Sequence, residues 1–197
     1  GQKVKEGDVL VTFDPYHIPI ISSHDGKVQY RHFTPKNIRD EKFHIMDTMK
    51  PGSTVFLNAD NDLLKDAPRR EGIIYKYFSA EGNKDCDCYA TDIVFKNAMP
   101  EFSAHIGEKN VQVRLNVFGK HQISNALAAL AVADHYKLSL ESAAKHLETF
   151  RGFAHRQELI ELNGVIIIDD TYNASPDSMK SSLSILEGFE GRRKIAV

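Results

Sequence analysis

The chain has 197 residues, of which 42% are hydrophobic, and its 25 Lys and Arg residues nearly balance its 27 Asp and Glu residues. This balance lacks the basic excess of a dedicated nucleic-acid-binding protein or of a protein held on an anionic membrane. No apolar run approaches the ~20 residues that span a bilayer, and no signal-peptide core is visible, so we expect a cytoplasmic protein without membrane or nucleic-acid partners. Two cysteines, Cys86 and Cys88, are too few for a zinc site or a disulfide framework and are interpreted as reduced thiols.

Short apolar and β-branched runs dominate residues 1–42 and predict three short strands, separated by turns such as Glu6-Gly7-Asp8 and Asp14-Pro15. The charge density then rises through 39–42, which is typical of an exposed connection between units. We place a domain boundary at residue 42, so that 1–42 form a β-rich segment.

In the next stretch, 43–151, runs in which apolar and polar residues alternate come first and Ala- and Leu-rich runs follow, which predicts a sheet followed by helices. Strands are expected over 54–57, 73–78, 89–95 and 111–117, with the sheet continuing to Phe118. The run 124–136 is rich in Ala and Leu and apolar all round, which predicts a buried helix. A second helix is expected over 139–150, with Ser139 as its N-cap.

In 152–197 a hairpin is expected from strands 158–162 and 165–168 around Asn163-Gly164, with the second strand buried on both faces. A helix should follow over 178–188, with Ser175 as N-cap and Pro176 at its first position. Its apolar stripe would be Met179, Leu183 and Leu186. Arg193–Val197 begins another strand, so we expect a chain truncated at its end, and the absence of an initial methionine suggests the same at its front.

Polar groups follow the buried strand directly at Asp169 and Asp170, which is how an α/β enzyme presents a ligand site. Adjacent residues in an extended strand point to opposite faces, so one of the two carboxylates is expected to be structural. The alternative is that one caps a turn and the other is solvated. Tyr172 and Asn173 would hydrogen-bond a ribose or a phosphate, or Asn173 would serve only the turn.

Two further segments carry candidate ligand groups. Residues 118–125, FGKHQISN, place polar side chains at a helix N-terminus, which suits an anion or a base edge. The alternative is that Ser124 or Gln122 caps the helix and Asn125 faces water. His155 and Arg156 follow Gly152 at an expected hinge, where the guanidinium would clamp a phosphate or remain an ordinary surface group.

Three segments together resemble the Mur ligases of peptidoglycan synthesis: FGKHQISNALAALAVA, ETFRGFAHRQELIELNG and VIIIDDTYNASPDSMKSSLSIL. The YNASPDSM part is similar to the D-alanyl-D-alanine-adding (MurF) type, and Met49-Lys50-Pro51-Gly52 and the 56–60 strand end, FLNAD, also fit it. The resemblance implies an α/β fold. Residues 43–151 would be the later part of the central ATPase domain, and 152–197 the start of a Rossmann-like C-terminal domain.

The resemblance also implies an ATP- and Mg²⁺-dependent peptide ligase. Its substrates would be UDP-N-acetylmuramoyl tripeptide and D-alanyl-D-alanine. Asn125 would contact the adenine, with Gln122 where the family usually has Asn. His155 and Arg156 would face ribose and phosphate, and Asp170 would accept from the ribose hydroxyls. Tyr172 and Asn173 would lie near the phosphates.

The sequence departs from that family in lacking a G-x-x-x-x-G-K-[ST] phosphate loop, and the glutamate, histidine and carbamylated lysine that hold Mg²⁺ are also not found. We therefore expect no catalytic residues or metal ligands here and no ligase turnover by these 197 residues alone.

Residues 1–42 resemble a different protein. KVKEGDVLVTFDPYHIPIISSHDGKVQY is similar to a β segment of the bacterial RNA polymerase β′ subunit, with a lipoyl-like or hammerhead fold; a generic β-meander is the alternative. Since the two resemblances belong to unrelated machines, a fusion, a chimera and a misassembled gene all stay open. The alternative functions are a non-catalytic polymerase-related module and an inactive chimeric scaffold.

Overall fold

The computed structural model describes residues 2–4, 9–13, 18–21, 26–28, 35–65, 68–96, 98–174, 176–189, 191 and 193–197. The chain divides by its contacts into two units, Gly1–His44 and Ile45–Val197. Within the described residues, no helix has the length and apolar character needed to cross a membrane.

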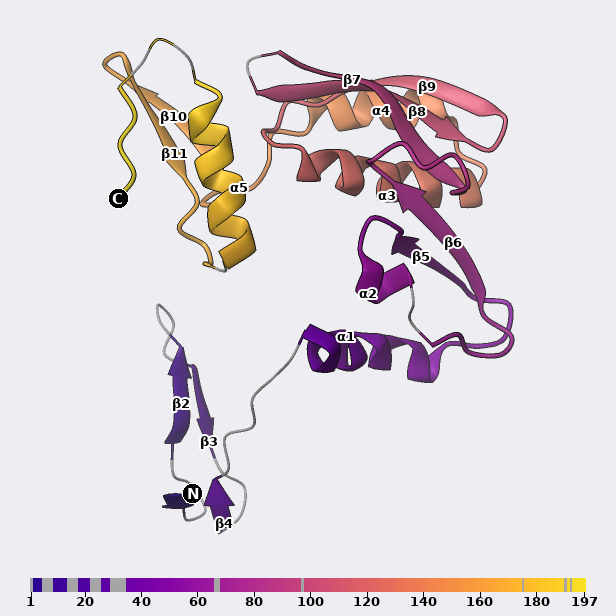
Figure 1. Ribbon diagram of the computed structural model, residues 1–197, viewed down its shortest axis with the longest axis vertical. Coiled ribbons are helices and arrows are strands. Elements are labelled where there is room, and N and C mark those ends of the chain that lie inside the picture. Colours follow the sequence, from indigo (N-terminus) through magenta and orange to yellow (C-terminus); the bar gives the residue numbers. More distant parts are fainter. Residues whose placement is uncertain are drawn as a thin grey trace. The chain divides into compact units, whose positions relative to one another are not determined.

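The first unit contains two antiparallel strand pairs, drawn in indigo in Figure 1. Strand β1 (Gln2–Val4) pairs with β4 (Gly26–Val28), and β2 (Val9–Phe13) pairs with β3 (Ile18–Ile21). The β-rich prediction is confirmed, with four strands where three were expected. The predicted turns at 6–8 and 14–15 lie outside the described residues.

A helix, α1 (Pro35–Phe43), occupies the stretch that we expected to be a plain connection. Asp40, Glu41 and Lys42 are exposed, as expected, but the backbone is helical. Pro35 suits the first helical position, and Arg, Lys and Glu are good helix formers, so a charged segment of this composition can form a solvated helix.

The second unit is built on a five-stranded mixed sheet, and the predicted α/β class is confirmed. After a short 3₁₀ helix, η1 (His44–Thr48), the elements are β5 (Thr54–Asn58), α2 (Asp62–Lys65), β6 (Ile74–Ser79), β7 (Cys88–Lys96), β8 (Met99–Ile106) and β9 (Lys109–Arg114). The strand order is β5-β6-β7-β8-β9, with β5, β6 and β7 parallel and β8 and β9 antiparallel to their neighbours.

The strand predictions for this sheet missed one strand and carried the sheet too far at its end. Strand β8 was not predicted, although Pro100, Phe102, Ala104 and Ile106 alternate with period two and are buried. The sheet also ends at Arg114, not at Phe118. Leu115 N still bonds to Pro100 O in the register of the β8–β9 ladder, and beyond it residues 116–118 are not strand, before Gly119 N bonds to Ala98 O.

Helices α3 (His121–His135) and α4 (Leu140–Thr149) cover the sheet, α3 against β5–β8 and α4 against β9 (Figure 1). Ile123, Leu127 and Leu130 of α3 are fully buried in the core with Phe102 of β8. The predicted burial of this helix is confirmed for its inner face, whereas Ala129 and Val132 are exposed on its outer face, so the apolar residues are not buried all round. The Ser139 N-cap is confirmed: its hydroxyl accepts from Ser142 N at 3.1 Å.

Cys88, the first residue of β7, and Cys86, in the turn before it, are free thiols, as predicted. Cys88 is fully buried, and desolvation raises its pKa to about 12. Such a thiol is a small core side chain and not a nucleophile.

The last elements are β10 (Glu158–Leu162), β11 (Val165–Asp169) and α5 (Pro176–Glu187). The predicted hairpin is confirmed, with Asn163 and Gly164 at φ +51° and +81°, the left-handed pair that a tight two-residue turn requires. Pro176 starts α5 as predicted, whereas the Ser175 cap lies outside the described residues.

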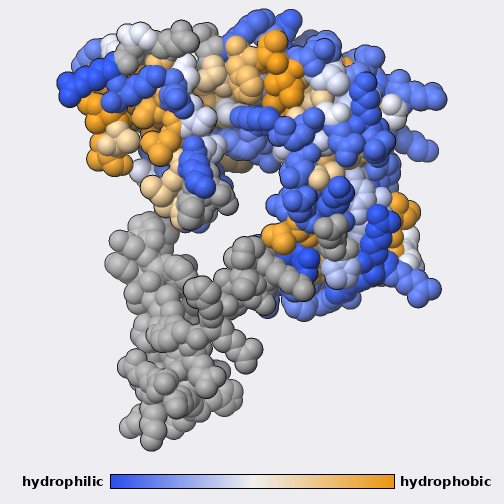
Figure 2. Space-filling model, viewed as in Figure 1, coloured by the Kyte–Doolittle hydropathy of each residue, from blue (hydrophilic) through white to orange (hydrophobic). Residues whose placement is uncertain are grey.

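Three predictions for this region were wrong. Val165 and Ile167 are 58% and 43% exposed, because β10 and β11 form a two-stranded sheet with one face that no described residue covers; apolar residues show at the surface there in Figure 2. Among the α5 side chains that the structure describes, Ile185 is buried, whereas Met179 and Leu183 of the predicted stripe are exposed and Leu186 is half-buried. Residues 193–197 do not form a strand, since no described strand hydrogen-bonds to them.

Candidate nucleotide site

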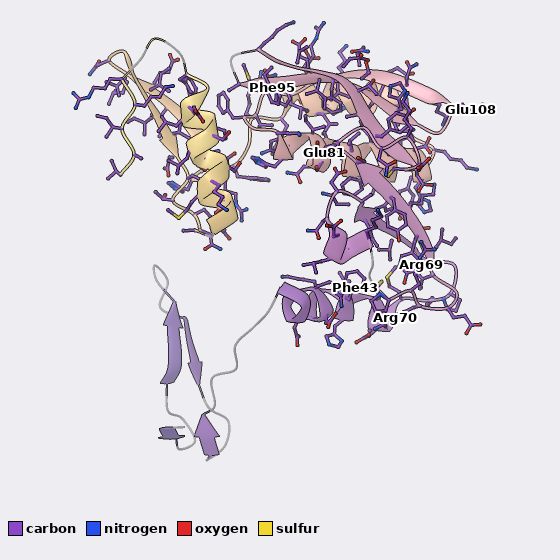
Figure 3. All side chains as sticks on the ribbon, viewed as in Figure 1. Phe43, Arg69, Arg70, Glu81, Phe95 and Glu108 are labelled. Carbon is purple, nitrogen blue, oxygen red and sulfur yellow. The ribbon has the colours of Figure 1, made fainter. Side chains whose placement is uncertain are left out.

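The carboxyl ends of β5 and β6 are tied together by Asp60. Its Oδ1 accepts from the buried Ser79 hydroxyl at 2.5 Å, and its Oδ2 accepts from Ala80 N at 2.7 Å. Glu81 then forms an ion pair with Lys120, N···O 2.7 Å, just before α3; Figure 3 labels Glu81 beside that helix. The strand ends and the start of α3 are thus fixed to one another. Sequence reasoning left Asp60 out of the site, although an acid just after a buried strand was an available signal.

At the start of α3, the Asn125 amide nitrogen donates to Gln122 Oε1 at 3.0 Å. The two residues are three apart and share one face of the helix. Asn125 is exposed. An amide offers both a donor and an acceptor, which is the complement of the adenine N6 and N7 edge. The pair can therefore recognise a base, and Gln122 orients Asn125.

His155 connects the loop before β10 with the end of β11 through three hydrogen bonds. Its backbone N donates to Glu158 Oε2 at 3.1 Å, its Nδ1 lies 2.8 Å from Asp169 Oδ2, and its carbonyl accepts from Tyr172 N at 3.0 Å. The hydrogen bond to Asp169 raises the pKa of His155. Hydrogen bonds from Thr171, and then from His155, lower the pKa of Asp169. The contacts assign Asp169 a structural role in holding this loop.

Arg156 lies over the ring of Tyr172, with its Cζ 3.9 Å from the ring centroid. Tyr172 is 60% exposed, so this cation–π pair is at the surface. A guanidinium stacked on a ring keeps its in-plane N–H groups available to an anion. The structure thus brings together Arg156 and Tyr172, which sequence reasoning had both placed near phosphate.

Asp170 faces different partners from Asp169, as the adjacency argument predicted. It accepts from the Ser182 hydroxyl of α5, and Ser182 in turn accepts from Gln157 Nε2 at 3.3 Å. Asn173 Oδ1 accepts from Ala174 N at 2.8 Å. This side chain therefore serves the turn, which was the alternative to ligand binding. Sequence reasoning missed Gln157 and Ser182.

One group of metal-ligand atoms is found among the described residues: those of His155, Glu158 and Asp169 lie within 4.8 Å of one another. Mg²⁺ prefers oxygen ligands in octahedral geometry, whereas this set includes an imidazole nitrogen already bonded to Asp169. The group does not fit the Mg²⁺ ion that a ligase would use, and we assign no step to it.

The sequence profile of the Mur ligase middle domain matches residues 22–133, more than half of the chain. The chain belongs to the Mur ligase family. Among curated Mur ligases, the UDP-N-acetylmuramate--L-alanine ligase of Dictyoglomus turgidum is 30% identical over 96% of this chain and 41% of its own length. The UDP-N-acetylmuramoyl-tripeptide--D-alanyl-D-alanine ligase of Bacillus subtilis is 30% identical over 81% of this chain and 34% of its own length. The chain thus spans less than half of either ligase.

Solved Mur ligase structures have the same fold. MurF from Acinetobacter baumannii superposes with a TM-score of 0.69 and 30% identity, covering 78% of this chain and 33% of that one. MurF from Thermotoga maritima, in complex with ADP, superposes with a TM-score of 0.68 and 25% identity, covering 81% of this chain and 36% of that one.

A second, shorter likeness lies outside the Mur ligases. A stretch of 45 residues, 23% of this chain, is 93% identical to the DNA-directed RNA polymerase subunit β′ of Fusobacterium nucleatum and covers 3% of that subunit. The polymerase resemblance proposed from the sequence is therefore present alongside the Mur ligase domain.

Proposed function

We propose that this chain provides the adenine- and ribose-facing part of an ATP-dependent ligase of the MurF type, which joins D-alanyl-D-alanine to UDP-N-acetylmuramoyl tripeptide. In that reaction the substrate carboxylate takes the γ-phosphoryl group of ATP, and the amine then displaces phosphate. The family relationship and the ADP-bound MurF neighbour support this proposal.

The observation that carries the proposal is the stacking of Arg156 on Tyr172 at the end of β11, two residues from Asp170. A fixed guanidinium suits a phosphate, and a carboxylate suits the ribose hydroxyls, so the two groups together match a nucleotide. Asn125 would bind the adenine edge, oriented by Gln122. His155 would act indirectly, by holding the Arg156 loop against Asp169.

These residues bind and orient, and none of them supplies the cradle for the transferring phosphoryl group. The 197 residues contain no G-x-x-x-x-G-K-[ST] sequence. We therefore propose nucleotide binding without ligase turnover by this polypeptide. A coupled phosphate-release assay with both substrates and ATP should stay at background, and clear turnover would contradict that part.

Nucleotide binding itself is tested by the melting temperature, because a ligand that binds only the folded state stabilises it. ADP should raise the melting temperature and GDP should raise it less. Cooperative unfolding with no shift in either nucleotide would favour an inactive chimeric scaffold.

The 45-residue likeness to the polymerase β′ subunit supports a second candidate, a non-catalytic module that associates with RNA polymerase. The test is a pull-down with purified polymerase subunits. Association that is unaffected by ADP would favour this module, and no association would reject it.

A further inference from the structure

Ser181 and Ser182 are consecutive residues of α5 whose hydroxyls contact two different elements. Ser182 donates to Asp170, directly after β11. Ser181 Oγ lies 3.0 Å from Nδ1 of His121, the first residue of α3. Successive side chains on a helix are rotated by about 100°, so neighbouring serines can serve two partners. One turn of α5 therefore contacts both the strand-end carboxylate and the start of α3.

The Ser181 side of α5 also packs against the segment that leads into α3. Ser181 and Ile185 are four residues apart on α5 and share one side of it, and Phe189 follows just beyond the end of the helix. Ile185 is 4% exposed, and the Phe189 ring centroid lies 6.2 Å from that of Phe118. The exposed contact between Ser181 and His121 therefore lies beside a packed surface.

Gly119 makes room for this contact. Its φ is +95°, and a Cβ placed there would lie 2.8 Å from His121 Cε1 and 3.2 Å from Ile185 Cδ1. Desolvation lowers the pKa of His121, and the charge of Asp170 opposes that shift, so the two side chains are within electrostatic reach. The imidazole is held between the glycine turn and α5.

His121 is four residues before Asn125, so both lie on one face of α3. Ser181 therefore acts on the helix that carries the adenine-facing amide, and Ser182 acts on the ribose-facing carboxylate. Neither serine is among the residues proposed to touch the nucleotide.

We propose that Ser181 and Ser182 are positioning residues of the nucleotide site. Ser182 orients Asp170 toward the ribose, and Ser181, through His121, sets α3 so that Asn125 and Asp170 meet the same nucleotide. This inference rests on the proposed function.

The test measures the affinities for ADP and for 2′,3′-dideoxy-ADP by calorimetry on the full chain. The variants are Ser181→Ala and Ser182→Ala. Ser184→Ala is the matched control, since Ser184 is exposed on the same helix. Ser181→Thr and Ser182→Thr keep the hydroxyl and should restore binding. Melting temperatures without nucleotide establish that each variant is folded.

Ser182→Ala should weaken ADP about tenfold and remove most of the preference for ADP over the dideoxy analogue, because the carboxylate loses its orienting donor. Ser181→Ala should weaken both nucleotides equally, by about three- to tenfold, because a smaller fraction of molecules has the competent arrangement. Ser184→Ala should match the unsubstituted protein.

If the unsubstituted protein binds ADP and both alanine variants bind it as Ser184→Ala does, the inference is overturned while the proposed function stands. Equal binding of ADP and its dideoxy analogue by the unsubstituted protein would overturn the role of Ser182. No ADP binding by the unsubstituted protein would reject the proposed function, and this inference with it.

Discussion

The guanidinium carbon of Arg156 lies 3.9 Å from the centre of the Tyr172 ring. The two residues come from different segments, one before β10 and one after β11, and the hairpin brings them together. This relationship places a fixed cation beside the acids at the strand end.

Replacing Arg156 by Ala should weaken ADP binding about tenfold or more, because a charge-assisted contact to phosphate is lost. Adenosine, which has no phosphate, should bind equally well to both proteins. Tyr172→Phe keeps the ring beneath the guanidinium and should retain affinity, whereas Tyr172→Ala should lose part of it. Calorimetry on the unsubstituted protein and the three variants gives these affinities. An equal loss of adenosine affinity in Arg156→Ala would contradict the phosphate role.

Asn125→Ala should reduce the preference for ADP over GDP by about tenfold, because a bidentate contact to the adenine edge is removed. Asn110→Ala, an exposed amide on β9, is the control and should leave the preference unchanged. Competition between the two nucleotides gives the ratio directly. An unchanged ratio in Asn125→Ala would show that the base is read elsewhere.

The pair of His155 and Asp169 predicts a pH window for stability. The pKa of His155 is raised above 6.5, so its contribution is complete below that value and is lost as pH rises through the folded pKa. The pKa of Asp169 is lowered below 3.8, so its contribution is present above that value and is lost as pH falls through the folded pKa.

The pair should therefore stabilise most between about pH 4 and 6.5. His155→Asn suits the left-handed backbone at this position, φ +61°, and removes the imidazole. Its melting temperature should fall below that of the unsubstituted protein at pH 5.5 and approach it at pH 9. A difference independent of pH would contradict the ion pair as the cause.

Gly119→Ala should destabilise the protein more than Gly107→Ala does. Both positions have left-handed backbone, so both substitutions cost about 1 to 2 kcal/mol. Only at Gly119 would the new Cβ also meet the His121 ring, at 2.8 Å, whereas nothing lies within 4 Å at Gly107. Urea unfolding gives the two free energies, and equal losses would show that the ring moves freely.

The features that the sequence predicted well are those set by neighbours in the chain. The Asn163-Gly164 turn and the Ser139 cap depend on local backbone geometry, and both are present. Strand β8 was overlooked because Pro100 is unusual within a strand, and its burial depends on distant partners in β7 and β9. The exposure of Val165 could not be read from its apolar run, because burial depends on what covers the sheet.

In the candidate site, too, the sequence pointed to individual residues but not to the distant contacts that hold them. The resemblance to Mur ligases singled out Arg156, Tyr172 and Asp170, which the structure places at one strand end. The contacts that hold them come from Ser182 and Gln157, whose hydroxyl and amide carry no sequence signal of their own. Whether these residues bind a nucleotide stays a prediction.

The most direct test of the central claim is a calorimetric titration of ADP into the unsubstituted 197-residue chain and into the double variant Asn125→Ala/Arg156→Ala. We predict saturable binding of one ADP per chain, and a loss of affinity in the double variant equal to or greater than that of either single variant. No binding to the unsubstituted chain, or equal affinity in the double variant, would contradict a nucleotide site built from these residues.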